Sequence, residues 1–233
     1  MATEVKQPEV IVPKSSEEKL VQSTKDFWSK NSKLIVYGLT AVVILVGGYI
    51  IYNNYFKAPA EAAANELIWK AEQNFKIDSF RLALNGDGTK ANPGFLRIIR
   101  NQGGTKAGNL SQFYAGICYL QLGDFNNATK YLEDFSTDQS ELKLRAAGSL
   151  GDAYAELGKN DKAIEYYKKA STAFENDEIN SSEYLYRLAQ LQDKMGKTSD
   201  AIESFKLLKQ KYPITSRGQE ADKYLAKLGD VSN

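Results

Sequence analysis

The sequence predicts an all-α protein in which a single N-terminal transmembrane helix precedes an α-solenoid of helix pairs. Residues 34–52 form one uncharged apolar run, and residues 109–213 repeat one spacing of small and aromatic residues three times. The 233 residues include no histidine, so the chain has no imidazole base, no Ser-His-Asp nucleophile and no histidine-bound zinc. These observations favour a binding protein over an enzyme.

Residues 1–33 read as a cytoplasmic tail with a short amphipathic helix. Residues 1–14 contain Pro8 and Pro13 without any periodicity, which is typical of a disordered segment. An apolar stripe then follows at helical spacing, made by Leu20, Val21, Thr24, Phe27 and Trp28. We expect this helix to end at Asn31-Ser32. Either it lies on the membrane or against a membrane partner, with Phe27 and Trp28 as the surface contacts, or it is a lead-in without a partner.

The run at residues 34–52 is long enough to cross a bilayer. At about 1.5 Å per residue it reaches roughly 28 Å, close to the ~30 Å hydrocarbon core. Three lysines precede it and only Lys57 follows closely, so the positive-inside rule places the N-terminus in the cytoplasm. In a two-membrane bacterium the span then lies in the inner membrane, and residues 53–233 lie in the periplasm. Ala58-Pro59-Ala60 resembles a signal cleavage site, but it lies well beyond a run longer than signal sequences use, which favours an uncleaved anchor.

Residues 109–213 repeat a pattern that suits pairs of packed helices. A small residue comes first, then a glycine seven residues later and an alanine five residues after that; the three copies are Gly116, Gly123 and Ala128, then Gly151, Gly158 and Ala163, then Ala189, Gly196 and Ala201. The small residues allow two helices to approach closely, and the glycines end the first helix in a left-handed conformation. The pattern resembles the tetratricopeptide repeat, which implies a solenoid of helix pairs of about 34 residues each.

The flanking segments complete the predicted solenoid. Residues 53–108 are expected to form a linker helix at 60–75 and a degenerate first repeat, with a turn at 85–88 and a short helix at 95–100. The turn resembles half of a calcium loop but lacks the later ligands and the closing glutamate, so no metal site is expected. Residues 214–233 are expected to form a capping helix. We expect no cofactor.

The candidate site is the concave groove that the first helices of such pairs form. Helical spacing assigns eight residues to it: Leu110, Phe113, Ile117, Arg145, Asp152, Glu183, Tyr186 and Gln190. An alternative for Phe113 and Ile117 is that the preceding helix covers them. The net charge of +1 gives no basic field for nucleic acid, and Cys118 reads as a small buried hydrophobe. No catalytic constellation is present in the sequence.

The layout as a whole resembles the YfgM-like ancillary subunits of the bacterial Sec translocon. The local match is Lys25-Asp26-Phe27-Trp28-x-Lys30-Asn31-x-Lys33, and Gly151-Asp152-Ala153-Tyr154 is similar to the Bacteroidetes version. The resemblance implies a non-enzymatic, chaperone-like adaptor that works with SecYEG, a PpiD-like membrane-anchored chaperone and secreted client chains. Two alternatives remain: a scaffold of another envelope assembly, in cell-wall or outer-membrane biogenesis, and an organelle-anchored cytosolic adaptor.

Overall fold

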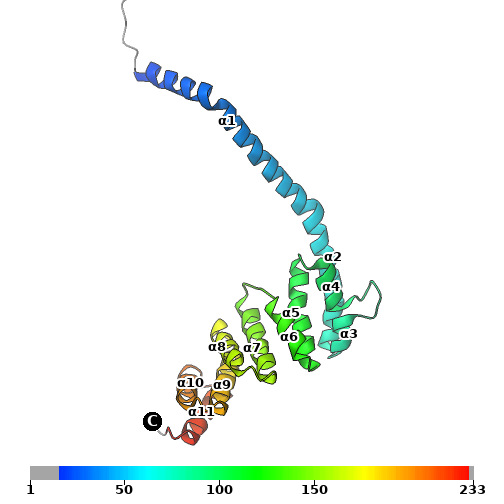
Figure 1. The fold of residues 1–233 in the computed structure, drawn as a ribbon, viewed down its shortest axis with the longest axis vertical. Helices are drawn as coiled ribbons and strands as arrows, with labels where there is room; N and C mark the ends of the chain where they lie inside the picture. Colours follow the sequence, from blue (N-terminus) through cyan, green and yellow to red (C-terminus); the bar gives the residue numbers. More distant parts are fainter. Residues whose placement is uncertain (1–15, 231–233) are drawn as a thin grey trace, which may run out of the picture. The chain divides into compact units, whose positions relative to one another are not determined.

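The structure is a computed structural model that describes residues 16–230, and these residues form helices and turns without any strand (Figure 1). The all-α prediction is therefore confirmed. Two compact units make up the chain, an N-terminal unit of residues 1–56 and a C-terminal unit of residues 57–233. The predicted disordered tail at residues 1–14 lies outside the described residues.

The N-terminal unit is built on one long helix, α1 (Ser16–Tyr52), which is followed by the π-helical turn η1 (Asn53–Lys57). Our expectation that a helix ends at Asn31-Ser32 is wrong. The helix continues through both residues, and Asn31 Nδ2 donates to the carbonyl oxygen of Phe27, one turn earlier, at 2.9 Å. An 18-residue window of this region has a mean hydropathy of 2.4 and no buried residue, so by length and composition it is a candidate membrane span.

The C-terminal unit begins with three helices that pack together on the first repeat. They are α2 (Ala58–Lys76), α3 (Phe80–Asn85) and α4 (Gly94–Gln102). Phe95 is fully buried in this part of the core, and its ring stacks on Tyr114 at 5.1 Å. Between α3 and α4, the Asp87 carboxylate accepts hydrogen bonds from the Thr89 amide and hydroxyl, which close this turn.

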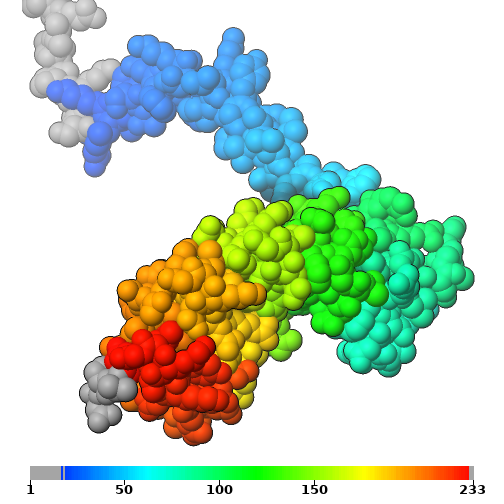
Figure 2. Space-filling model, turned by 60° about the horizontal axis from the view of Figure 1, so that its bottom comes forward, coloured from blue at the N-terminus to red at the C-terminus, as the bar shows by residue number. Residues whose placement is uncertain are grey.

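Three helix pairs and a final helix follow. The pairs are α5 (Lys106–Gln121) with α6 (Phe125–Glu133), α7 (Ser140–Glu156) with α8 (Asn160–Ala173), and α9 (Glu178–Lys194) with α10 (Thr198–Lys211), and the final helix is α11 (Ser216–Lys227). Each of these helices packs against the next in chain order. Figure 2 shows the successive pairs side by side, from green through yellow to red. This is an α-solenoid of helix pairs, as the sequence predicts.

The pattern glycines serve the packing that the sequence predicts. Gly123, Gly158 and Gly196 have φ values of 76°, 68° and 73°, a left-handed conformation that favours glycine. At Gly151 a Cβ atom would come within 2.4 Å of the Tyr167 ring, and at Gly116 within 2.5 Å of Leu132. The first helix of each of these two pairs therefore needs glycine where the second helix crosses it. Cys118 is buried as expected, and burial raises the pKa of its thiol to about 12.

Candidate partner-binding groove

A groove of about 510 Å³ opens on the first helices of the solenoid. It receives residues from α2, α5, α7 and α9, which are Glu72, Phe75, Lys76, Phe113, Tyr114, Ile117, Leu142, Arg145, Ser149, Asn180 and Tyr184. Its walls are mostly apolar and aromatic, with a few polar groups, the composition usual for binding sites in proteins.

The aromatic part of the groove is held by ring contacts and by one close approach. Phe75 of α2 meets Tyr114 of α5 edge to face at 5.1 Å between ring centroids. On the other side, the Tyr184 ring of α9 lies against the backbone of α7 at Gly148, where a Cβ atom would be only 1.9 Å from Tyr184 Cζ. Glycine at position 148 therefore makes room for this ring beside the groove.

Charged side chains of both signs surround the aromatic part. Arg145 forms an ion pair with Glu141 at 3.2 Å, and each side chain is more than half exposed. Exposed pairs of this kind contribute little to stability, so the Arg145 guanidinium is available to another carboxylate. Lys76 and Glu72 of α2 add one charge of each sign to the groove. The arrangement can receive an apolar side chain of a polypeptide and pair with a charged neighbour.

Three of the eight predicted groove residues line this groove, namely Phe113, Ile117 and Arg145. Phe113 is only 7% exposed, and Ile117 is half-buried. The other five do not line it. Leu110 is half-buried against the core. Asp152, Glu183 and Tyr186 take part in contacts between helices, whereas Gln190 is exposed and donates a hydrogen bond to the Tyr186 hydroxyl of its own helix.

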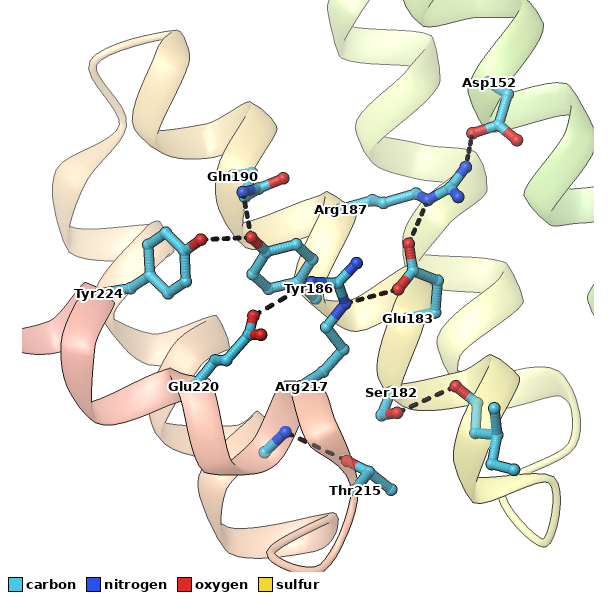
Figure 3. A network of polar contacts seen from close by, with 12 residues as sticks. Asp152, Ser182, Glu183, Tyr186, Arg187, Gln190, Thr215, Arg217, Glu220 and Tyr224 are labelled. Carbon is cyan, nitrogen blue, oxygen red and sulfur yellow. Dashed lines mark hydrogen bonds and ion pairs between the residues drawn. The ribbon is translucent and has the colours of Figure 1, made fainter.

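A chain of ion pairs occupies the C-terminal part of the predicted face (Figure 3). Arg187 of α9 binds Asp152 of α7 at 2.6 Å and Glu183 of its own helix at 2.8 Å. Glu183 also accepts a hydrogen bond from Arg217 of α11 at 2.7 Å, and Arg217 contacts Glu220 at 3.1 Å. These contacts link α7, α9 and α11, so Asp152 and Glu183, which we expected to line the groove, pair with other residues of the protein.

Tyr186 is covered by the final helix, in contrast to our expectation. Its hydroxyl shares a hydrogen bond with the hydroxyl of Tyr224 in α11 and accepts one from Gln190 (Figure 3). The Arg217 guanidinium lies over the Tyr186 ring at 4.1 Å, and the residue is 6% exposed. Helix α11 thus covers this part of the face, and the groove around Phe113 and Tyr184 is the open part.

The acid stability of the C-terminal unit should depend on Glu183. Burial alone would raise its pKa, but hydrogen bonds from Arg217 and Arg187 outweigh burial and hold the pKa below the ordinary value of 4.5. A carboxyl group with a lowered folded-state pKa stabilises the fold above its unfolded-state pKa, and this contribution is lost as the pH falls through the folded-state value. We expect Glu183→Gln to show a smaller loss of unfolding free energy below pH 4.5 than the parent in urea titrations. Glu141→Gln, whose carboxylate is more than half exposed, is the control, and equal acid sensitivity of parent and Glu183→Gln would contradict this role.

Sequence spacing missed the groove residues outside the expected helix positions. Phe75 and Lys76 come from α2, which carries no copy of the repeat pattern, so its register could not be read from the pattern. Tyr114 directly follows the predicted Phe113, and Tyr184 directly follows the predicted Glu183. The one sequence feature that points to Tyr184 is Gly148, the small residue against which its ring packs. Phe27 and Trp28 are exposed in α1 by 61% and 55%, and their contact with a membrane stays a prediction.

Comparison with known families agrees with this architecture. A family model described as a tetratricopeptide repeat-like domain matches residues 25–150, more than half of the chain, and a tetratricopeptide repeat model matches residues 142–207. No curated protein matches the chain. Repeats of this type mediate contacts between proteins, so the C-terminal unit is a protein-interaction scaffold. The chain belongs to the tetratricopeptide repeat-like domain family.

Proposed function

We propose that this chain is a non-enzymatic, membrane-anchored adaptor that binds extended polypeptide segments in the groove. The observation that carries the proposal is the groove itself, whose apolar and aromatic walls lie on the first helices of a repeat scaffold. An extended segment inserts one apolar side chain near Ile117 and Leu142. A charged neighbour of that side chain pairs with Arg145 or Glu72.

We further propose that the adaptor works at the Sec translocon, on the periplasmic side of a bacterial inner membrane. The resemblance of residues 25–33 to the ancillary translocon subunits supports this assignment, as does the excess of lysine before the apolar run. The family match begins at Lys25, ahead of the run, which supports a retained anchor over a cleaved signal. The proposed partners are SecYEG, a PpiD-like chaperone and emerging client chains.

The anchor gives the proposed mechanism its efficiency. Tethering two partners in one membrane makes the second contact effectively intramolecular, with effective concentrations that reach the mM range for short flexible linkers. A groove of modest affinity then captures a segment as it leaves the membrane channel, and release stays fast because the segment makes few contacts. The scaffold needs no catalytic group for this role.

Crosslinking in living cells tests the translocon assignment. The full-length chain is crosslinked, purified in detergent and probed for SecY and the PpiD-like chaperone. A matched chain in which an unrelated span replaces residues 34–52 controls for crowding in the membrane. We expect SecY to be crosslinked to the parent chain and to be crosslinked much less to the chain whose span is replaced. Absence of SecY and of the PpiD-like chaperone from the parent sample would contradict the assignment and favour another envelope assembly.

A further inference from the structure

The second helix of the first repeat pair is shorter than its counterparts. Helix α6 has nine residues, whereas α8 and α10 have 14 each. The segment after α6 is tied to the start of α5: Asn109 Nδ2 donates to the Ser136 carbonyl oxygen at 2.7 Å, and the Ser136 amide donates to Asn109 Oδ1 at 3.2 Å. This paired contact fixes residues 134–139 outside a continued α6 helix.

A cleft of about 620 Å³ lies where α6 stops. It is lined by Leu132, Glu133, Phe135, Ser136, Thr137, Lys143, Ala146, Ala147, Leu150, Tyr166, Lys169 and Ala173. When the first repeat is aligned on the second so that Gly116 corresponds to Gly151, Phe135–Asp138 corresponds to Ala170–Ala173, the last turn of α8. The cleft therefore borders the position that a longer α6 would fill with its last turn. It uses a different face of α7 from the groove, since Ala146, Ala147 and Leu150 line it in place of Arg145 and Ser149.

The charged side chains around the cleft favour a ligand that carries an acidic group. Lys143 and Lys169 line the cleft together with one carboxylate, Glu133, whose Oε1 accepts hydrogen bonds from the hydroxyls of Tyr154 and Tyr166. The Lys143 side chain has no hydrogen-bond or ion-pair partner within residues 16–230. The Lys169 ammonium lies over the Tyr166 ring at 4.7 Å and forms an ion pair with Glu165, and both side chains of this pair are more than half exposed, which makes the pair weak.

We propose that this cleft binds a short segment of a partner protein that supplies the missing helical turn. The segment places one large apolar side chain against the half-buried Phe135 and Ala147 and directs an acidic side chain to Lys143. The volume lies within the range of about 300–1,000 Å³ found for specific binding sites. This second site is independent of the groove and of the translocon assignment, and it allows the scaffold to hold two proteins at once.

Disulfide trapping on the full-length chain in detergent tests the proposal, because the native Cys118 is buried and does not compete. Ser136→Cys places a thiol at the cleft, and Ser140→Cys places one on the exposed start of α7 as the matched control. The probes are three capped pentapeptides, each with an N-terminal cysteine: one carries adjacent leucine and glutamate, one leucine and lysine, and one serine and glutamate. Mass spectrometry measures the adduct fraction in a glutathione redox buffer.

We expect Ser136→Cys to trap the leucine–glutamate peptide about tenfold more than the serine–glutamate peptide and about threefold more than the leucine–lysine peptide. Lys143→Glu should reverse the preference for glutamate over lysine, whereas Lys168→Glu, an exposed change outside the cleft, should leave it in place. Equal trapping of the three peptides, or the same preference at Ser140→Cys, would overturn the proposal. Protection of Ser136→Cys by laurate with no preference among the peptides would overturn it in favour of a small amphiphile.

Discussion

Gly108→Ala should destabilise the C-terminal unit by about 2–4 kcal/mol. The clash of the new methyl group with the backbone costs about 1–3 kcal/mol, and the backbone shift that relieves it breaks a helix cap that contributes about 1 kcal/mol. A Cβ atom at position 108 would lie 2.0 Å from the carbonyl oxygen of Gln102, so the backbone itself must move. The Gly108 amide also donates to Thr105 Oγ1 at 2.9 Å, and that bond caps α5. Chemical denaturation of the full-length chain in detergent measures the loss.

Gly104→Ala is the matched control because it lies four residues earlier in the same connection. A Cβ atom there meets no heavy atom within 4 Å, and the residue is exposed. We expect a change within about 0.5 kcal/mol, as for most surface substitutions. If both alanine variants unfold at the same denaturant concentration as the parent, the close contact between the α4 end and the start of α5 is not present in the protein.

Phe205→Ala should cost about 3–5 kcal/mol and loosen α11 from the solenoid. The Phe205 side chain is 1% exposed, and its ring stacks on Tyr224 at 5.0 Å and meets Tyr186 edge to face at 6.2 Å. Removing the ring leaves a cavity beneath the helix that covers Tyr186. Hydrogen exchange should show faster exchange of the α11 amides, together with a lower unfolding free energy.

Leu207→Ala, two residues further along α10, provides the control for this prediction. Leu207 is 38% exposed and makes no contribution to the aromatic cluster, so we expect less than about 1 kcal/mol. A Phe205 variant that keeps slow exchange in α11 would show that the remaining contacts of the helix, such as the ion pairs of Arg217 and the buried Leu225, are sufficient to hold it. In that case the aromatic cluster does not attach α11.

The repeat pattern predicted the fold well because each of its positions has a steric reason. A glycine that must be left-handed, as at 123, 158 and 196, and a small residue beneath a crossing helix, as at 116 and 151, are detectable in a single sequence. The pattern had no means to show α3, a helix of six residues that begins after Asp78 at a positive φ of 57°. The expected break at Asn31-Ser32 failed because the Asn31 side chain bonds within the helix.

The candidate site was less predictable than the fold. Helical spacing identified Phe113, Ile117 and Arg145, which lie on the helices that carry the repeat pattern. It could not show that α11 covers Tyr186, because the position of the last helix depends on tertiary contacts such as Arg217 with Glu183. Ion pairs between repeats form only where the side chains of neighbouring helices come within contact distance. The spacing of residues along the sequence does not give that distance.

Photocrosslinking from the groove tests the central claim, that this scaffold binds extended polypeptides there, most directly. A photoreactive amino acid replaces Ile117 or Leu142 in the full-length chain in cells that express an arrested secreted protein, and Leu122, which is 39% exposed and outside the groove, serves as the control position. We predict crosslinks to the secreted chain from both groove positions and only background crosslinking from position 122. Arg145→Glu should reduce the crosslinks to acidic segments of the secreted chain. Equal crosslinking from all three positions, or none from the groove, would contradict the claim.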